Sequence, residues 1–131
     1  SMPGRFGAIL LDAPCSSERH VMADTGVLAE WTAARVRALA VRQWALLSSA
    51  LIMLAPGGCL VYSTCALSPE ENDGVVARAA ARYGPALAFD RPEYPGPGEA
   101  ELTEYGLSIL PDRAGGAGPM YVCRMKMPRA T

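Results

Sequence analysis

The chain has 131 residues, a formal net charge of −1 and a sequence pI near 5.8. Half of its residues are hydrophobic, so the length and composition fit one domain with a core of its own. The nearly neutral charge excludes a protein that binds RNA through overall positive charge, so phosphate contacts would have to come from a local patch or a partner. Ser1-Met2 is interpreted as a cloning remnant, and residues 1–131 as one unit.

The four cysteines form no CxxC pair, and the chain has one histidine, so we predict no metal site. We expect reduced thiols and an intracellular location, because the sequence shows no signal peptide and has the composition of a core-forming domain. No membrane association is predicted, since the longest apolar run, near residues 45–55, is short and contains Ser48 and Ser49.

The first half of the chain alternates strands and helices. Residues 7–12 are a short apolar strand, which we expect to be buried on both faces as in a parallel sheet. Apolar residues at three- and four-residue spacing predict a long helix from about residue 27 to residue 54. The Pro-Gly-Gly at residues 56–58 is expected to end that helix, and the apolar residues 59–62 predict the next strand.

A second helix is expected soon after this strand. Ser68 suits the N-cap and Glu71 completes a capping box, so we predict a helix over residues 69–83. Cys65 would then lie between the carboxyl end of a strand and the amino end of a helix. Ligands bind at such places in open α/β sheets, and a helix amino end favours thiolate over thiol.

The last third of the chain is less regular. Residues 87–89 and 106–110 are predicted short strands, and residues 120–127 alternate toward a final strand with Tyr121 and Cys123 on one face. The order strand-helix-strand-helix-strand-strand predicts an α/β fold with a mostly parallel sheet and a terminal antiparallel hairpin. Because a glycine-rich nucleotide loop after the first strand is absent, the pattern corresponds to the second half of a doubly wound fold.

Reactive side chains follow both predicted strands: Asp12 and Cys15 after the first, Cys65 after the second. If these strands are neighbours, two thiols and a carboxylate share one sheet edge, a set that suits chemistry on a pyrimidine. A thiolate that adds to carbon-6 of cytosine activates carbon-5, a carboxyl group offsets the developing charge, and a second group helps remove the carbon-5 proton. The competing interpretation is two ordinary buried thiols and a carboxylate that caps the next turn.

Other candidates have simpler interpretations. Cys59 and Cys123 lie within predicted strands and are interpreted as core residues. Three arginines of the predicted long helix are interpreted as a solvated face, and the alternative is a surface that contacts RNA. These residues are Arg35, Arg37 and Arg42.

Two motifs, LLDAPCSSERH (residues 10–20) and LVYSTCALSPEEN (residues 60–72), resemble those of the Sun-type (Fmu-type) RNA cytosine-5 methyltransferases. Pro-Gly-Gly before the second motif and GPMYVCRMK at residues 118–126 also fit. The resemblance implies a Rossmann-like, S-adenosylmethionine-dependent methyltransferase fold, with residues 1–131 as the carboxyl-terminal half of the catalytic domain. It implies methyl transfer to carbon-5 of a cytosine in rRNA or tRNA, with rRNA favoured, through a covalent cysteine–cytosine adduct.

The resemblance also assigns roles to residues. Cys65 matches the family's nucleophile, Cys15 the cysteine for product release, and Asp12 the residue that faces the target cytosine and the methionine end of the cofactor. DNA cytosine methyltransferases, an alternative, use the proline-cysteine thiol and lack the second cysteine. Arg19 and His20 are the candidate RNA-binding residues, although His20 also suits a plain loop hydrogen bond.

The same comparison bears on partners and location. Arg19-His20 and the GPMY motif look most like the mitochondrial ribosomal-RNA members, which favours mitochondria, with nucleus or cytoplasm left open. The family's cofactor loop and catalytic lysine would lie upstream of residue 1, so the fragment alone is expected to be inactive. Its exposed sheet edge is expected to be covered by a protein partner or by self-association. The alternative function is a catalytically incompetent module that binds RNA or protein.

Overall fold

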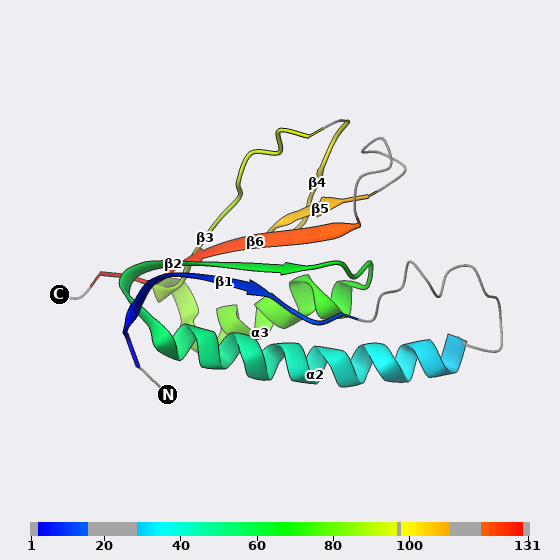
Figure 1. Ribbon diagram of the computed structural model, residues 1–131, viewed down its shortest axis with the longest axis horizontal. Coiled ribbons are helices and arrows are strands. Elements are labelled where there is room, and N and C mark those ends of the chain that lie inside the picture. The colour runs from blue at the N-terminus through cyan, green and yellow to red at the C-terminus, as the bar shows by residue number, and fades with distance from the viewer. Residues whose placement is uncertain (1–2, 16–28, 97, 111–118, 130–131) are drawn as a thin grey trace.

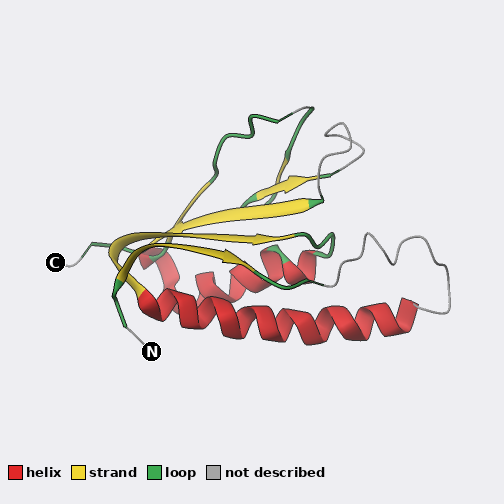
Figure 2. Ribbon diagram, viewed as in Figure 1, coloured by secondary structure: helices red, strands yellow, loops and turns green. Residues whose placement is uncertain are grey.

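The computed structural model describes residues 3–15, 29–96, 98–110 and 119–129. Two α-helices, α2 (Ala29–Met53) and α3 (Asp73–Tyr83), lie on the same side of a sheet (Figures 1 and 2). Short 3-10 turns flank α3, namely η1 (Pro69–Glu71) and η2 (Gly84–Ala86). The described part of the chain is therefore a sheet with helices on one face.

The described sheet has six strands: β1 (Phe6–Asp12), β2 (Leu54–Thr64), β3 (Ala88–Asp90), β4 (Glu101–Leu102), β5 (Leu107–Ile109) and β6 (Met120–Lys126). Their order is β1-β2-β6-β5-β4, and β3 pairs with the other end of β6. β1 and β2 are parallel, whereas β6 is antiparallel to β2, β3 and β5. β1, β2, β3 and β5 therefore point one way, and β4 and β6 the other.

The predicted α/β fold, with strands mostly in one direction and a terminal hairpin of β5 and β6, is confirmed. Antiparallel pairing is nevertheless more extensive than the sequence suggested. The reason is that β6 inserts between β2 and the strands that run parallel to β2, so each of these neighbours meets it in the opposite direction. β4, which the sequence did not predict, adds one more antiparallel pairing to β5.

The core lies between the sheet and the helices. The predicted alternation along β6 is confirmed, because Tyr121, Cys123 and Met125 are buried while Met120 is exposed. Burying one large apolar side chain stabilises the fold by roughly 1.5–3 kcal/mol. Besides Tyr121 and Met125 of β6, the large apolar members of the core are Leu47 and Leu51 from α2, Leu60 and Tyr62 from β2, and Val75 and Val76 from α3.

β1 was expected to be buried on both faces, and this prediction is wrong. Ile9 and Leu11 pack against the core, but Leu10, on the opposite face, is 74% exposed. The core against which Ile9 and Leu11 pack lies between the sheet and the helices, and β1 lies at the edge of the described sheet. A run of apolar residues does not by itself show whether one face of a strand is buried or both.

The Pro-Gly-Gly at residues 56–58 was expected to separate helix from strand, and this prediction is also wrong. α2 ends at Met53, and β2 begins directly at Leu54. The triplet lies inside β2, where the register against β1 shifts and Gly57 adopts a φ of 76°. A positive φ costs glycine little, so the triplet makes an irregularity within the strand and does not act as a terminator.

Helix α2 differs from the prediction in one further respect. Ala33–Met53 is long and apolar enough, by length and composition alone, to cross a membrane, whereas the sequence predicted no such run. However, Leu47 and Leu51 of this helix are fully buried against the sheet and α3. We therefore interpret α2 as a helix that packs on the sheet through one face.

Candidate active site

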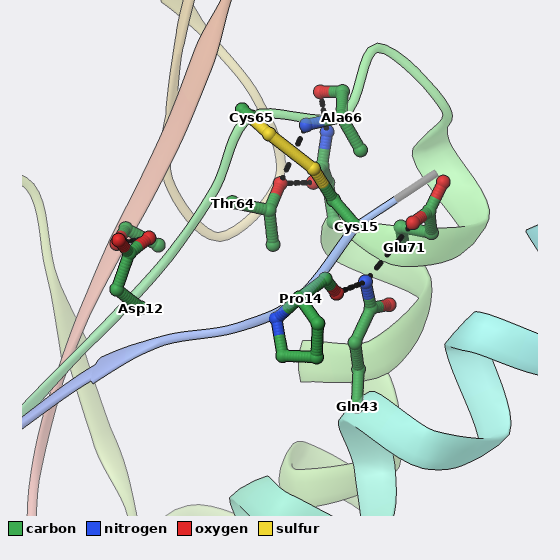
Figure 3. Close-up of a disulfide and its surroundings, with 10 residues drawn as sticks. Asp12, Pro14, Cys15, Gln43, Thr64, Cys65, Ala66 and Glu71 are labelled. Carbon is green, nitrogen blue, oxygen red and sulfur yellow. Dashed lines mark hydrogen bonds between the residues drawn. A yellow bond between two sulfur atoms is a disulfide. The ribbon is translucent and has the colours of Figure 1, made fainter. Parts of the chain in front are cut away.

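The ends of β1 and β2 lie side by side at one edge of the sheet. Asp12 pairs with Ser63 in the parallel ladder, and the Ala13 N–H donates to the Ser63 carbonyl at 2.9 Å. The loops that follow the two strands are therefore neighbours, and they carry Cys15 and Cys65 (Figure 3). The prediction that both cysteines share one sheet edge is confirmed.

A pocket of about 580 Å³ opens between these two loops, within the size range of small-molecule sites. Its described lining comes from the end of β1, from the loop after β2 and from the start of β6: Asp12, Ala13, Pro14, Cys15, Thr64, Cys65 and Met120. The three residues that the sequence proposed as catalytic all lie in this one pocket. Among the described residues, no group of three or more potential metal ligands is found.

Cys15 and Cys65 are joined by a disulfide, with their Cα atoms 6.2 Å apart. The prediction of reduced thiols is therefore wrong for this pair. That prediction rested on composition and compartment, whereas the pairing follows from two strand ends that lie within the usual Cα separation of a disulfide. Both sulfur atoms must be reduced before either can act as a thiolate.

Asp12 is exposed at the mouth of this pocket. The Ser63 hydroxyl donates to its Oδ1 at 3.1 Å and orients the carboxylate. An ionised carboxylate accepts several hydrogen bonds, so this contact, the one it makes with the described residues, leaves acceptor positions on a side chain that lines the pocket. The arrangement suits an amine or a positively charged ligand group.

The turn that carries Cys65 is closed by a buried polar network. The Thr64 hydroxyl donates to Asn72 Oδ1 at 2.5 Å and accepts from the Ala66 N–H at 3.1 Å. Asn72 Nδ2 in turn donates to the Ala66 carbonyl at 3.0 Å. These three residues flank Cys65 and are at least 95% buried, so the exposed Cys65 is presented from a rigid support.

The predicted capping box and single helix over residues 69–83 are wrong. Pro69–Glu71 forms the separate turn η1, and α3 begins only after Asn72, whose ψ of −105° interrupts the helix. The Ser68 hydroxyl bonds Glu70, and the Glu71 side chain accepts a hydrogen bond from Gln43. Asn72 is the N-cap residue of α3, but its side chain makes no capping hydrogen bond because it bonds Thr64 and Ala66. A three-residue turn gives Cys65 no helix dipole.

Sequence reasoning missed Gln43 and Thr64. Gln43 is completely buried in the middle of α2, where a polar residue interrupts the apolar stripe. That interruption is a usable signal, because a buried amide requires hydrogen-bond partners. The candidate RNA-binding residues Arg19 and His20 lie outside the described residues.

The remaining cysteines differ from the pair in the pocket. Cys123 is fully buried, as predicted, and burial raises the pKa of its thiol to about 12. Cys59 is half-buried.

We expect iodoacetamide at pH 8 to label Cys59 in the oxidised protein, and to label Cys15 and Cys65 only after reduction. Cys123 should stay unlabelled, because its thiolate fraction at this pH is about 10⁻⁴.

Mass spectrometry of the digested protein measures this labelling pattern. The oxidised and reduced samples are alkylated in the folded state, and a sample unfolded in urea is the control in which Cys123 also reacts. Labelling of Cys15 and Cys65 before reduction would contradict the disulfide.

Comparisons with known proteins agree with this geometry. A profile of the family described as "16S rRNA methyltransferase RsmB/F" matches residues 1–126. The chain belongs to this family. The RsmB/F family consists of S-adenosylmethionine-dependent methyltransferases.

Individual relatives point the same way. The chain is 38% identical over 128 residues to ribosomal RNA small subunit methyltransferase F of Serratia proteamaculans. This alignment covers 96% of this chain and 27% of the relative. It is 45% identical over 113 residues to the protein of the same name from Cronobacter sakazakii, covering 85% and 24%. This RsmB/F chain thus spans about a quarter of the length of the curated relatives it matches.

Solved structures share the fold of the RsmB/F chain. A methyltransferase homologue from Pyrococcus horikoshii aligns with a TM-score of 0.62 and 30% identity, over 94% of this chain and 39% of that one. NSun6 from the same organism, solved with the S-adenosylmethionine analogue SFG, aligns with a TM-score of 0.69 and 24% identity over 92% and 30%. The second likeness shows the fold alone.

Proposed function

We propose that this chain is the carboxyl-terminal half of the catalytic domain of an rRNA methyltransferase that acts on carbon-5 of cytosine. One observation supports it above all: two cysteines 50 residues apart in sequence meet beside an exposed carboxylate in one pocket. Thiolate addition to a pyrimidine needs one such cysteine, and release of the product needs a second group nearby. The family match and the names of the relatives support rRNA as the substrate.

The steps we propose use the residues of the pocket. Once a thiol reductant has converted the disulfide to two thiols, itself becoming a disulfide, the Cys65 thiolate forms a bond to carbon-6 of the cytosine, and the electron pair of the carbon-5 to carbon-6 double bond moves to carbon-5. S-adenosylmethionine, when bound, supplies the methyl group that carbon-5 takes. The Cys15 thiolate then accepts the carbon-5 proton, the C–H electron pair forms the carbon-5 to carbon-6 double bond again, and the bond between carbon-6 and sulfur breaks so that its electron pair returns to the Cys65 thiolate.

Asp12 is the residue that can contact both the cofactor and the target cytosine. Its carboxylate is exposed, lines the pocket and is oriented by Ser63, so it can accept from the exocyclic amine of cytosine or face a positively charged sulfonium. The turn closed by Thr64 and Asn72 holds Cys65 at a constant place relative to that carboxylate. Positioning of this kind contributes to rate because the reacting groups need no further ordering.

The decisive experiment is a methylation assay on the full-length protein. We expect reduced protein, small-subunit rRNA and S-adenosylmethionine with a labelled methyl group to yield labelled 5-methylcytosine, identified by mass spectrometry of nucleosides. We also expect the oxidised protein to be inactive and to recover activity on addition of dithiothreitol, since the disulfide removes the nucleophile. Methyl label at another atom would overturn the cytosine carbon-5 assignment.

Binding of rRNA without any methyl transfer would instead favour the alternative, a catalytically incompetent module of the same fold. The resemblance to mitochondrial members stays a prediction, as does a protein partner or self-association that covers β1. The role of Arg19 and His20 in RNA binding also stays a prediction.

A further inference from the structure

Gln43 is a polar residue in an apolar place. It lies near the middle of α2, its side chain is completely buried, and its neighbours along the helix face include the core residue Leu47. An amide that is buried without hydrogen bonds destabilises the folded state, so the position of Gln43 requires specific partners.

The two partners of the Gln43 amide are the residue before Cys15 and the last residue of the turn that follows the Cys65 loop (Figure 3). Gln43 Nε2 donates to the Pro14 carbonyl at 2.5 Å and to Glu71 Oε1 at 3.0 Å. Pro14 directly precedes Cys15, and Glu71 ends the turn η1 that follows the Cys65 loop. One amide group with two N–H donors therefore joins the two sides of the pocket.

The orientation of this amide is set by its acceptors. Gln43 Oε1 is buried and accepts no hydrogen bond from the described residues. Reversing the amide would place an oxygen against a carbonyl and a carboxylate, which repel it. The unpartnered oxygen is the cost of directing both N–H groups at the two loops.

This connection begins where the strand pairing ends. Among the described residues, the hydrogen bond from the Ala13 N–H to the Ser63 carbonyl is the last one between these two backbone segments, and Pro14 has no N–H to donate. The Pro14 carbonyl instead accepts from α2 through Gln43.

On the other side of the pocket, Glu71 is held to the sheet. The buried Tyr62 hydroxyl donates to its backbone carbonyl at 2.8 Å. Gln43 thus ties the Cys15 loop to a turn that is anchored on β2, the strand that leads to Cys65.

We propose that Gln43 is a positioning residue that holds the Cys15 and Cys65 loops at the separation that their chemistry needs. It does not line the pocket. The consequence for catalysis rests on the proposed function, but the consequence for the two thiols does not. Their tendency to form the disulfide reports directly on how well the loops are held.

The test uses the full-length protein with Gln43→Met, which keeps the side-chain length and removes both hydrogen bonds. The protein is equilibrated with oxidised and reduced glutathione, where two thiols and one oxidised glutathione give the protein disulfide and two reduced glutathiones. Mass spectrometry quantifies the Cys15–Cys65 fraction. We expect the equilibrium constant for disulfide formation to fall about tenfold, the factor that corresponds to the loss of about one net hydrogen bond.

Two further variants make the result specific. Gln43→Asn keeps an amide that is too short to reach both loops, and we expect a fall of about threefold; it decides the matter if Gln43→Met does not fold. Leu51→Val removes core volume from the same helix about two turns away, so urea unfolding should show lower stability while the thiol equilibrium stays within about twofold of the original. An unchanged equilibrium in both Gln43 variants, or an equal fall in Leu51→Val, overturns the proposal.

The methylation assay gives a second measurement on the same variants. We expect Gln43→Met to lower kcat about tenfold and to leave the KM for RNA within about twofold, because binding surfaces are intact while the reacting thiols are less well placed. If disulfide formation falls in Gln43→Met but the original protein transfers no methyl group, the result supports Gln43 as a positioning residue and overturns the proposed function. If the original protein methylates rRNA and Gln43→Met has an unchanged kcat, the result supports the proposed function and overturns Gln43 as a positioning residue.

Discussion

Replacing Cys65 by alanine is expected to reduce methyl transfer by about 10⁴-fold or more, because this variant has no thiolate to add to carbon-6 of the cytosine. Cys65 is the exposed cysteine of the pocket, and buried hydrogen bonds on both sides of it hold its turn. Those bonds do not involve its sulfur, so the fold should be retained. The measurement is incorporation of labelled methyl groups into rRNA under reducing conditions, together with a urea unfolding curve.

Cys59→Ala is the matched control for this variant. Cys59 is a half-buried cysteine of β2, the strand that precedes Cys65, and it does not line the pocket. We expect it to retain methyl transfer within about twofold. Full activity in Cys65→Ala would exclude Cys65 as the nucleophile, whatever the control shows.

Replacing Cys15 by alanine is expected to have a different effect, namely accumulation of a covalent protein–RNA adduct. The nucleophile and the methyl acceptor remain, but the group that assists release is lost, and such assistance is typically worth about 10²–10⁴-fold. The adduct should appear as a slowly migrating band on denaturing gels that ribonuclease removes. It should also form without a reducing agent, since Cys65 has lost its disulfide partner.

The double variant Cys15→Ala, Cys65→Ala controls for other attachment chemistry and should form no adduct. An adduct with Cys65→Ala in place of Cys15→Ala would reverse the two roles and favour the arrangement of DNA cytosine methyltransferases. Absence of an adduct in both single variants would remove the support for covalent catalysis at this pocket.

Much of the local structure was predictable because it depends on neighbouring residues. The period-2 pattern of β6 identifies its buried face, and the three- and four-residue spacing in α2 identifies the helix. The positions of Asp12, Cys15 and Cys65 after two strands were also predictable, and parallel pairing then brings them to one edge. Local patterns predicted the wrong structure at two places. The Pro-Gly-Gly lies inside β2, and the predicted helix start forms the separate turn η1.

The sequence by itself therefore determined the α/β order of elements and the strand-end positions of the two cysteines. Only the tertiary structure decided that their sulfur atoms are bonded, that one face of β1 is uncovered and that Gln43 links both loops. The reason is distance along the chain: the thiols are 50 residues apart, and Gln43 is 29 residues from Pro14 and 28 from Glu71. Such contacts depend on how α2 packs against two strand ends, which no local pattern around Cys15 or Cys65 specifies.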